Sequence, residues 1–144
     1  MKKINLYLDD KRVPIMSHNK DKGLGPNYSP ESKWVIVRDY FEFVDMINNH
    51  FDEIKLISFD HDLACFKQVN GIREEFTGKT SVDYLINFCL DNNKKMPDWY
   101  VHTDNTSGRG NIIGAILNYI RVVEEYDISG FRYFHNGIVN NKMI

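Results

Sequence analysis

The chain has 144 residues, of which 42% are hydrophobic and 26% are charged, and its formal net charge is -2 at pH 7. These values exclude a largely disordered chain and predict a single globular domain over residues 1–144. Cys65 and Cys89 are too few for a disulfide framework, and no apolar run is long enough to span a membrane. We therefore expect a cytoplasmic protein with no membrane partner and no extended basic surface for nucleic acid.

The first two predicted strands are joined by an unusually long loop. Residues 4–8 are rich in strand formers, and residues 34–37 form a short continuous apolar strand. Residues 13–33 between them contain prolines and glycines among polar residues, which predicts one long loop in place of a helix. A loop of this length in a small domain is often functional, for example as a lid.

Helices and strands alternate through the middle of the chain. Asp39 is a good N-cap for an amphipathic helix that ends near His50, and residues 54–59 form a third strand. Residues 63–76 have no clear period, so we expect a second loop there. Thr80 or Ser81 then caps another helix.

The last part of the chain predicts two further strands around a long helix. Residues 99–103 read as a fourth strand, and a tight polar turn follows it. Asn111 opens the helix with the strongest apolar face. Residues 131–135 are a candidate fifth strand, and we expect the polar tail, residues 136–144, to fray.

This alternation predicts a parallel sheet with helices on both faces. In such a sheet, ligands bind beyond the carboxyl ends of the strands. The first, third and fourth strands end in polar groups there: Asp9 and Asp10, then Asp60, then His102. In a flavodoxin-like strand order these strands are neighbours, about 4.8 Å apart. Two carboxylates about 4 Å apart repel by roughly 4 kcal/mol at an effective dielectric near 20, so the acids need a counter-charge.

A divalent cation is the first candidate for that counter-charge. Mg²⁺ prefers a few carboxylates with retained waters, whereas His61 or His102 as direct ligands would favour Mn²⁺ or Zn²⁺. Arg12 and Arg109 are the metal-free alternative. Because side chains alternate along a strand, Asp60 shares its direction with the second acid of the tip and not with His61. His102 is therefore the stronger candidate of the two histidines.

The turn after the fourth strand, residues 103–111, runs into a helix N-terminus. Free backbone amides and the positive end of the helix dipole suit a phosphate there, and Arg109 would add a fork of donors. The other interpretation is that Gly108 and Gly110 only relax a turn and Asn111 only caps the helix.

Five stretches together resemble a receiver-type domain, and more closely the divergent cyclic-phosphate-processing receiver family. They are LYLDDKR at residues 6–12, WVIVRDY at 34–40, ISFDHDL at 57–63, VHTDN at 101–105 and GRGNI at 108–112. The resemblance implies a receiver-like, flavodoxin-like three-layer α/β sandwich. Its central parallel sheet would have strand order 2-1-3-4-5, with the first crossover helix largely replaced by the long loop.

An ordinary receiver has an acidic pair, a phosphoacceptor Asp, a Ser or Thr and a Lys at successive strand ends. Asp9, Asp10, Asp60 and Thr103 match the first three requirements, and the Lys has no counterpart in residues 131–135. His61 and His102 are additions that phosphorelay does not need. The resemblance therefore implies a receiver scaffold turned to phosphate-ester chemistry.

The resulting hypothesis is a metal-assisted phosphoesterase that opens a cyclic phosphate on a small nucleotide or an RNA end. Its residues fall into three groups: catalytic His102, His61 and Asp60; metal-binding Asp9, Asp10, Asp60 and Asp62; phosphate-binding Arg12, Thr103, Asn105, Arg109 and Asn111. We expect Mg²⁺ or Mn²⁺ ahead of Zn²⁺. The alternatives are a module that binds a nucleotide or phosphate ligand without turnover, and a signalling receiver phosphorylated on Asp60.

Overall fold

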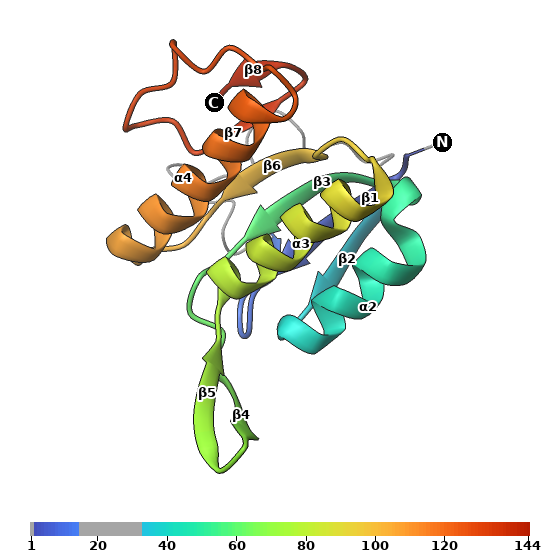
Figure 1. Cartoon of the computed structure of the whole chain (residues 1–144), viewed down its shortest axis with the longest axis vertical. Helices are drawn as coiled ribbons and strands as arrows, with labels where there is room; N and C mark the ends of the chain where they lie inside the picture. Colours follow the sequence, from blue (N-terminus) through green and yellow to red (C-terminus); the bar gives the residue numbers. More distant parts are fainter. Residues whose placement is uncertain (1, 15–32) are drawn as a thin grey trace.

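The computed structural model describes residues 2–14 and 33–144, and its centre is a six-stranded sheet (Figure 1). The strand order is β2-β1-β3-β6-β7-β8. The bounds are β1 Ile4–Leu8, β2 Lys33–Val37, β3 Ile54–Phe59, β6 Asp98–Val101, β7 Gly137–Val139 and β8 Lys142–Met143. Within this sheet, β2, β1, β3 and β6 pair in parallel, whereas β7 and β8 are antiparallel to their neighbours. The predicted α/β class and the order 2-1-3-4-5 are confirmed, with the fifth strand reversed in direction.

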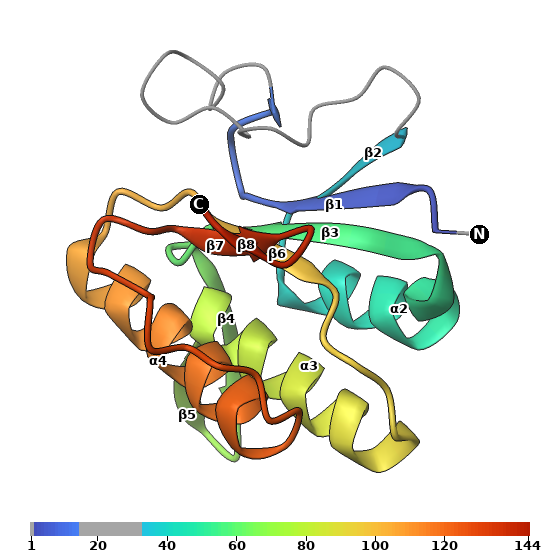
Figure 2. The same ribbon diagram turned by 90° about the horizontal axis from the view of Figure 1, so that it is seen from above.

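Three described helices cover one face of this sheet: α2 Tyr40–His50, α3 Gly78–Asn92 and α4 Thr106–Val122 (Figure 2). A short 3-10 helix, η2 Phe51–Glu53, follows α2. We expected helices on both faces, and in the described part of the chain they lie on one. The predicted long loop, residues 13–33, falls almost entirely outside the described residues. None of the described helices is long and apolar enough to cross a membrane.

Each of the three described α-helices begins directly after a residue whose side chain caps it. Asp39 caps α2 as predicted, because its carboxylate accepts from the Glu42 amide at 2.9 Å. The prediction of Thr80 or Ser81 as the next cap is wrong. Thr77 is the cap, and Thr80 completes a capping box by accepting from the Thr77 amide at 3.0 Å.

The prediction that α4 starts at Asn111 is also wrong. Asn105 is the cap, with its side-chain oxygen accepting from the Gly108 amide at 2.8 Å. Gly108 and Gly110 were assigned to a turn, yet they lie in the first turns of α4. Gly108 is needed there because a Cβ atom at this position would overlap the His61 ring.

Residues 63–76 contain a β-hairpin instead of the predicted loop. Strands β4 Cys65–Val69 and β5 Ile72–Phe76 pair antiparallel and project from the body of the fold (Figure 1). Asn70 and Gly71 connect them with φ of 52° and 79°, the left-handed backbone of a tight hairpin turn. Most side chains on both sides of this hairpin are exposed, so the sequence shows no alternation of apolar and polar residues.

The end of the chain is ordered, and the predicted strand at residues 131–135 is wrong. The fifth strand of the sheet is β7, followed by β8 in the stretch that we expected to fray. Asn140 and Asn141 make the turn between them with φ of 52° and 62°. Ile138 and Val139 are buried, which fixes this hairpin against the sheet.

Candidate functional site

Parallel strand register brings three polar side chains to one edge of the sheet. Leu8 pairs with Phe59, and Phe59 pairs with Val101, so the next residues of the three strands are neighbours. The Asp60 amide donates to Leu8 O at 2.9 Å, and the His102 amide donates to Phe59 O at 2.9 Å. Asp9, Asp60 and His102 follow core residues on the helix side of the sheet, and alternation therefore points them to its other face.

Asp9, Asp60 and His102 form a buried cluster. Their exposed fractions are 1%, 5% and 3%, and one ligand atom from each lies within 4.8 Å of the others. Carboxylate oxygens and an imidazole nitrogen at this spacing could hold a metal ion. The site requires such a partner or an equivalent positive charge, because buried carboxylates are costly when unpaired.

His102 is committed to two hydrogen bonds inside the protein. Its Nε2 lies 3.0 Å from Asp9 Oδ2, its Nδ1 lies 2.7 Å from Ser58 Oγ, and its ring stacks on Tyr7 with centroids 4.4 Å apart. Burial lowers the pKa of His102 and outweighs the opposing effect of Asp9 and Asp60. A neutral ring that donates from Nε2 to Asp9 and accepts at Nδ1 from the Ser58 hydroxyl satisfies both bonds.

The two carboxylates of the cluster differ in acidity. Burial raises the pKa of Asp9, but bonds from His102 and from the amides of Arg12 and Lys11 outweigh it and hold that pKa well below its usual value. Those amides donate to Asp9 Oδ1 at 2.8 and 2.9 Å. Burial and the charge of Asp9 raise the pKa of Asp60. Asp9 is thus the fixed anion of the site, and Asp60 is the carboxyl that takes up a proton more easily.

Arg12 supplies the positive charge that the described residues bring into contact with this cluster. Its guanidinium reaches Asp9 at 2.8 Å, Asp60 at 3.4 Å and Asp104 at 3.6 Å. Arg38, at the end of β2, donates to the carbonyls of Asp9 and Arg12 at 3.1 and 2.6 Å and so holds this turn in place. The metal-free counter-charge expected of Arg12 is therefore present in the structure.

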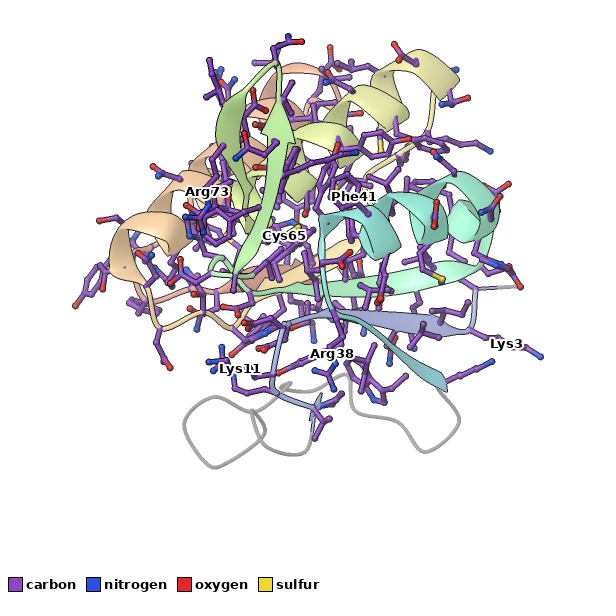
Figure 3. All side chains as sticks on the ribbon, turned by 90° about the horizontal axis from the view of Figure 1, so that it is seen from below. Lys3, Lys11, Arg38, Phe41, Cys65 and Arg73 are labelled. Atoms are coloured by element: carbon purple, nitrogen blue, oxygen red, sulfur yellow. The ribbon has the colours of Figure 1, made fainter. Side chains whose placement is uncertain are left out.

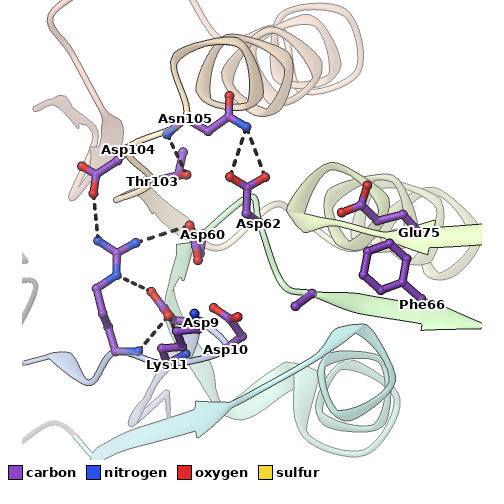
Figure 4. A pocket seen from close by; sticks show the side chains of 12 residues that line it. Asp9, Asp10, Lys11, Asp60, Asp62, Phe66, Glu75, Thr103, Asp104 and Asn105 are labelled. Atoms are coloured by element: carbon purple, nitrogen blue, oxygen red, sulfur yellow. Dashed lines mark hydrogen bonds and ion pairs between the residues drawn. The ribbon is translucent and has the colours of Figure 1, made fainter.

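A pocket of about 580 Å³ opens beside the cluster, a size typical of small-ligand sites. It is lined by Asp9, Asp10, Lys11, Arg12, Asp60, Asp62, Ala64, Phe66, Glu75, Thr103, Asp104 and Asn105. Six carboxyl groups and only two basic side chains are among them, so the pocket is strongly acidic (Figure 4). Neither His61 nor His102 lines it.

Asp62 lies on the rim of the pocket beside α4. Its carboxylate accepts from Asn105 Nδ2 at 3.1 and 3.2 Å and lies 2.9 Å from His61 Nδ1. The bond with His61, and then that with Asn105, lowers the pKa of Asp62. The His61 ring itself packs against Gly108, and its side chain is 15% exposed.

Two of the predicted phosphate ligands lie elsewhere. Arg109 donates to Asn136 Oδ1 at 2.8 Å, to Tyr133 O at 3.0 Å and to His135 O, so its guanidinium holds the segment before β7. Asn111 is exposed within α4, beyond the cap at Asn105. Neither residue lines the pocket, whereas the predicted ligands Arg12, Thr103 and Asn105 do.

The structure adds residues that sequence reasoning missed. Ser58 lies two positions before Asp60, and period-two alternation was the available signal that both face the same way. Phe66 and Glu75 come to the pocket on the hairpin. The pair Asn70-Gly71 was the signal for that hairpin.

A mostly parallel sheet with buried acids at the tips of β1 and β3 defines a receiver-like α/β protein. The family model described as "Cyclic-phosphate processing Receiver domain" matches residues 4–118. The chain therefore belongs to this family, and the expected resemblance is confirmed. No curated protein and no solved structure gives a significant match.

Proposed function

We propose that this protein is a phosphoesterase-type hydrolase that opens the cyclic phosphate of a small nucleotide or an RNA end, assisted by a divalent cation. The observation that carries the proposal is the cluster of Asp9, Asp60 and Arg12 at the wall of a pocket of ligand size. The family description names cyclic-phosphate processing, which supports this substrate class. Cys65 and Cys89 are both free and buried, which supports a reducing cytoplasm as the compartment.

The acidity of the pocket is the reason to include a cation. A phosphate diester is an anion, and six lining carboxyl groups would repel it. Asp9 and Asp10, with Asp60 and Asp62 in the same pocket, would hold Mg²⁺ or Mn²⁺, since carboxylate oxygens suit these ions and His102 Nε2 is occupied by Asp9. When bound, such an ion stabilises negative charge on phosphoryl oxygens.

The proposed reaction divides the remaining roles among residues of the pocket. A water oxygen bonds to phosphorus, and the bond between phosphorus and one ribose oxygen breaks, which gives a phosphomonoester. Asp60 accepts the proton of the water, and solvent water in the pocket returns one to the ribose oxygen. His61, outside the pocket lining, holds Asp62 in place through its Nδ1. Arg12, Thr103 and Asn105 donate to phosphoryl oxygens.

His102 has a positioning role in this proposal. Both of its nitrogens are bonded within the protein and its side chain is 0% exposed. It therefore acts through Asp9, whose carboxylate it orients and keeps ionised. This differs from the catalytic role that we expected of His102 from the sequence.

Hydrolysis of 2′,3′-cyclic nucleotides tests the proposal directly. The purified chain is incubated with each of the four nucleotides and with Mg²⁺, Mn²⁺ or Zn²⁺, and the phosphomonoester is measured by chromatography. Asp60→Asn is expected to lower the rate by about 10³-fold. The matched control Asp91→Asn, on the exposed side of α3, is expected to keep the parent rate. Absence of product with every metal, or an Asp60→Asn variant as fast as the parent, would refute the proposal.

A binding module without turnover is the second candidate, and one observation favours it. No histidine lines the pocket in the described part of the chain, so the most common acid–base side chain is not in direct reach of a ligand there. Calorimetry with cyclic and opened nucleotides separates the two candidates. Tight binding of the cyclic nucleotide with no product would identify a sensor.

A phosphoacceptor receiver is the third candidate. The described residues place Lys11, from the turn after β1, on the pocket wall, and no lysine reaches it from β7. Stable labelling of Asp60 by beryllofluoride or acetyl phosphate would support a signalling receiver.

A further inference from the structure

The β4–β5 hairpin contributes a second, chemically different end to the pocket. Phe66 and Glu75 pair directly across the two strands, and they line the pocket together with Ala64. Directly opposed residues of a hairpin share one face. That face is turned toward the acid cluster, with Asp62 between them (Figure 4). One pocket therefore runs from the buried carboxylates to an exposed aromatic ring.

The hairpin is held firmly enough to serve as a wall. Phe76, at the end of β5, stacks on Tyr40 with centroids 5.0 Å apart and contacts Phe41 at 5.1 Å. Lys67 Nζ lies 5.0 Å from the centroid of Phe41, on the face away from the pocket. These contacts join the base of the hairpin to the first turn of α2.

Phe66 presents its ring as a flat apolar surface. Its exposed fraction is 46%, although it is a large aromatic residue. The guanidinium carbon of Arg73 lies 4.0 Å from the ring centroid, and Arg73 does not line the pocket. Figure 3 shows Arg73 and Phe41 on opposite sides of the hairpin. Arg73 lies on the same face of the hairpin as Phe66 and Glu75, so it covers one face of the ring and fixes its orientation, since a cation over the ring face is attracted to it.

Glu75 is an acceptor without a donor. Its side chain is exposed, and no hydrogen bond or ion pair joins it to the described residues. An ionised carboxylate only accepts hydrogen bonds. It therefore suits a ligand edge that carries N–H donors, and two adjacent donors are bound best by its two oxygens.

We propose that this end of the pocket is a nucleobase subsite, in which the base stacks on Phe66 and offers its donor edge to Glu75. Guanine, whose Watson–Crick edge carries adjacent imino and amino donors, is the preferred base. The subsite rests on the proposed function, because it takes the nucleotide whose phosphate lies at the acid cluster. Stacking of a base on an aromatic side chain is tolerant of base identity, so the ring supplies affinity and the carboxylate supplies selectivity.

The test compares three variants of the full chain. Equilibrium binding of guanosine and uridine monophosphates is measured by calorimetry with Mg²⁺, and turnover of the four 2′,3′-cyclic nucleotides is measured in parallel. Phe66→Ala is expected to weaken binding of both monophosphates by about 10-fold. Glu75→Gln is expected to lower the preference for guanine by about 10-fold and to leave uridine binding unchanged. Glu74→Gln, a neighbouring exposed acid outside the pocket lining, is the matched control and is expected to match the parent.

The outcomes separate this inference from the proposed function. A base-free probe, methyl riboside 2,3-cyclic phosphate, should be hydrolysed by the parent and by Phe66→Ala equally well. If the parent hydrolyses this probe with the same KM as 2′,3′-cyclic GMP, the nucleobase subsite is refuted, whereas the proposed hydrolase activity is supported. If no probe is hydrolysed, the proposed function fails, and the binding data still decide the subsite. Equal affinity of parent and Phe66→Ala for guanosine monophosphate would overturn it, and a 10-fold loss would support it.

Discussion

Arg12 and Arg109 were the two candidates for a metal-free counter-charge to the acids of the site, and the structure gives them opposite surroundings. Arg12, after β1, meets three carboxylates, those of Asp9, Asp60 and Asp104. Arg109, in α4, meets the neutral oxygens of the segment before β7. The same side chain therefore balances charge in one region and fixes backbone geometry in the other.

This difference has a chemical consequence. A guanidinium among carboxylates occupies a position that another cation can also take, because both answer the same negative potential. A guanidinium bonded to carbonyl oxygens has no such substitute, because its fork geometry matches those acceptors. In the proposed function, ligands and a metal ion compete for the Arg12 region, whereas the Arg109 region is scaffold.

Removing each arginine is the strongest test of this comparison. Arg12→Ala should lower turnover of 2′,3′-cyclic GMP by about 10²-fold, since a donor to the phosphoryl group is lost. It should also tighten Mn²⁺ binding in the absence of substrate, since no guanidinium competes for Asp9 and Asp60. Arg109→Ala should change neither quantity by more than about threefold, while it lowers the free energy of unfolding by about 1–2 kcal/mol. Equal losses of turnover in the two variants would contradict this division of roles between Arg12 and Arg109.

The scaffold region around β7 can be destabilised without removing a charged side chain. A Cβ atom at Gly137 would overlap the Trp99 carbonyl oxygen, so Gly137→Ala should disrupt the pairing of β7 with β6. We expect a loss of about 3 kcal/mol in the free energy of unfolding, measured by urea denaturation. Gly114→Ala is the matched control, because nothing lies within 4 Å of its Cβ position in α4. It should raise stability by about 0.5–1 kcal/mol.

The two buried acids beside Arg12 should respond to neutralisation with opposite signs. The pKa of Asp9 is lowered in the folded protein, so its ionised form stabilises the fold above the unfolded pKa, and Asp9→Asn should cost about 2 kcal/mol at pH 7. The pKa of Asp60 is raised, so its ionised form opposes folding, and Asp60→Asn should stabilise the protein. Thermal melts in EDTA measure both. Destabilisation of equal size by the two variants would show that the acids are equivalent.

A smaller effect is expected on mild acidification. The folded pKa of His102 lies below its unfolded value of 6.5, so the unfolded chain takes up a proton that the folded protein does not. Stability should therefore fall between pH 7 and pH 5, with uptake of a proton by Asp60 acting in the opposite direction. His102→Gln, although less stable at pH 7, should show a flatter pH profile in denaturant melts. An unchanged slope would mean that His102 does not titrate as we infer.

The edge of the sheet that carries the site was predictable, because its position depends on short-range sequence patterns. Apolar runs that end in acids identify β1 and β3, and parallel pairing then brings Asp9, Asp60 and His102 together without knowledge of any loop. The burial of His102 and its bond to Ser58 accompany its stacking on Tyr7, which residue spacing does not reveal.

The failures have a different physical origin. The direction of Arg109 depends on residues 133–136, which come from the far end of the chain, and on a helix that starts at Asn105 instead of Asn111. The hairpin escaped detection because its exposed faces carry no hydrophobic period. The strand β7 was missed because a three-residue strand gives too short a pattern.

The segment that carries the β4–β5 hairpin starts and ends beside the tip of β3. The Gly78 amide donates to His61 O at 2.8 Å, and a Cβ atom there would overlap the Asp60 carbonyl. The chain therefore leaves the tip of β3 and returns to it at nearly the same point. Residues 66–75 form an exposed arm, so hairpins of other lengths and sequences can be grafted between the packed residues Cys65 and Phe76 without shifting the buried acids. Selectivity for the organic part of a substrate could then be re-engineered while the proposed hydrolytic centre stays fixed.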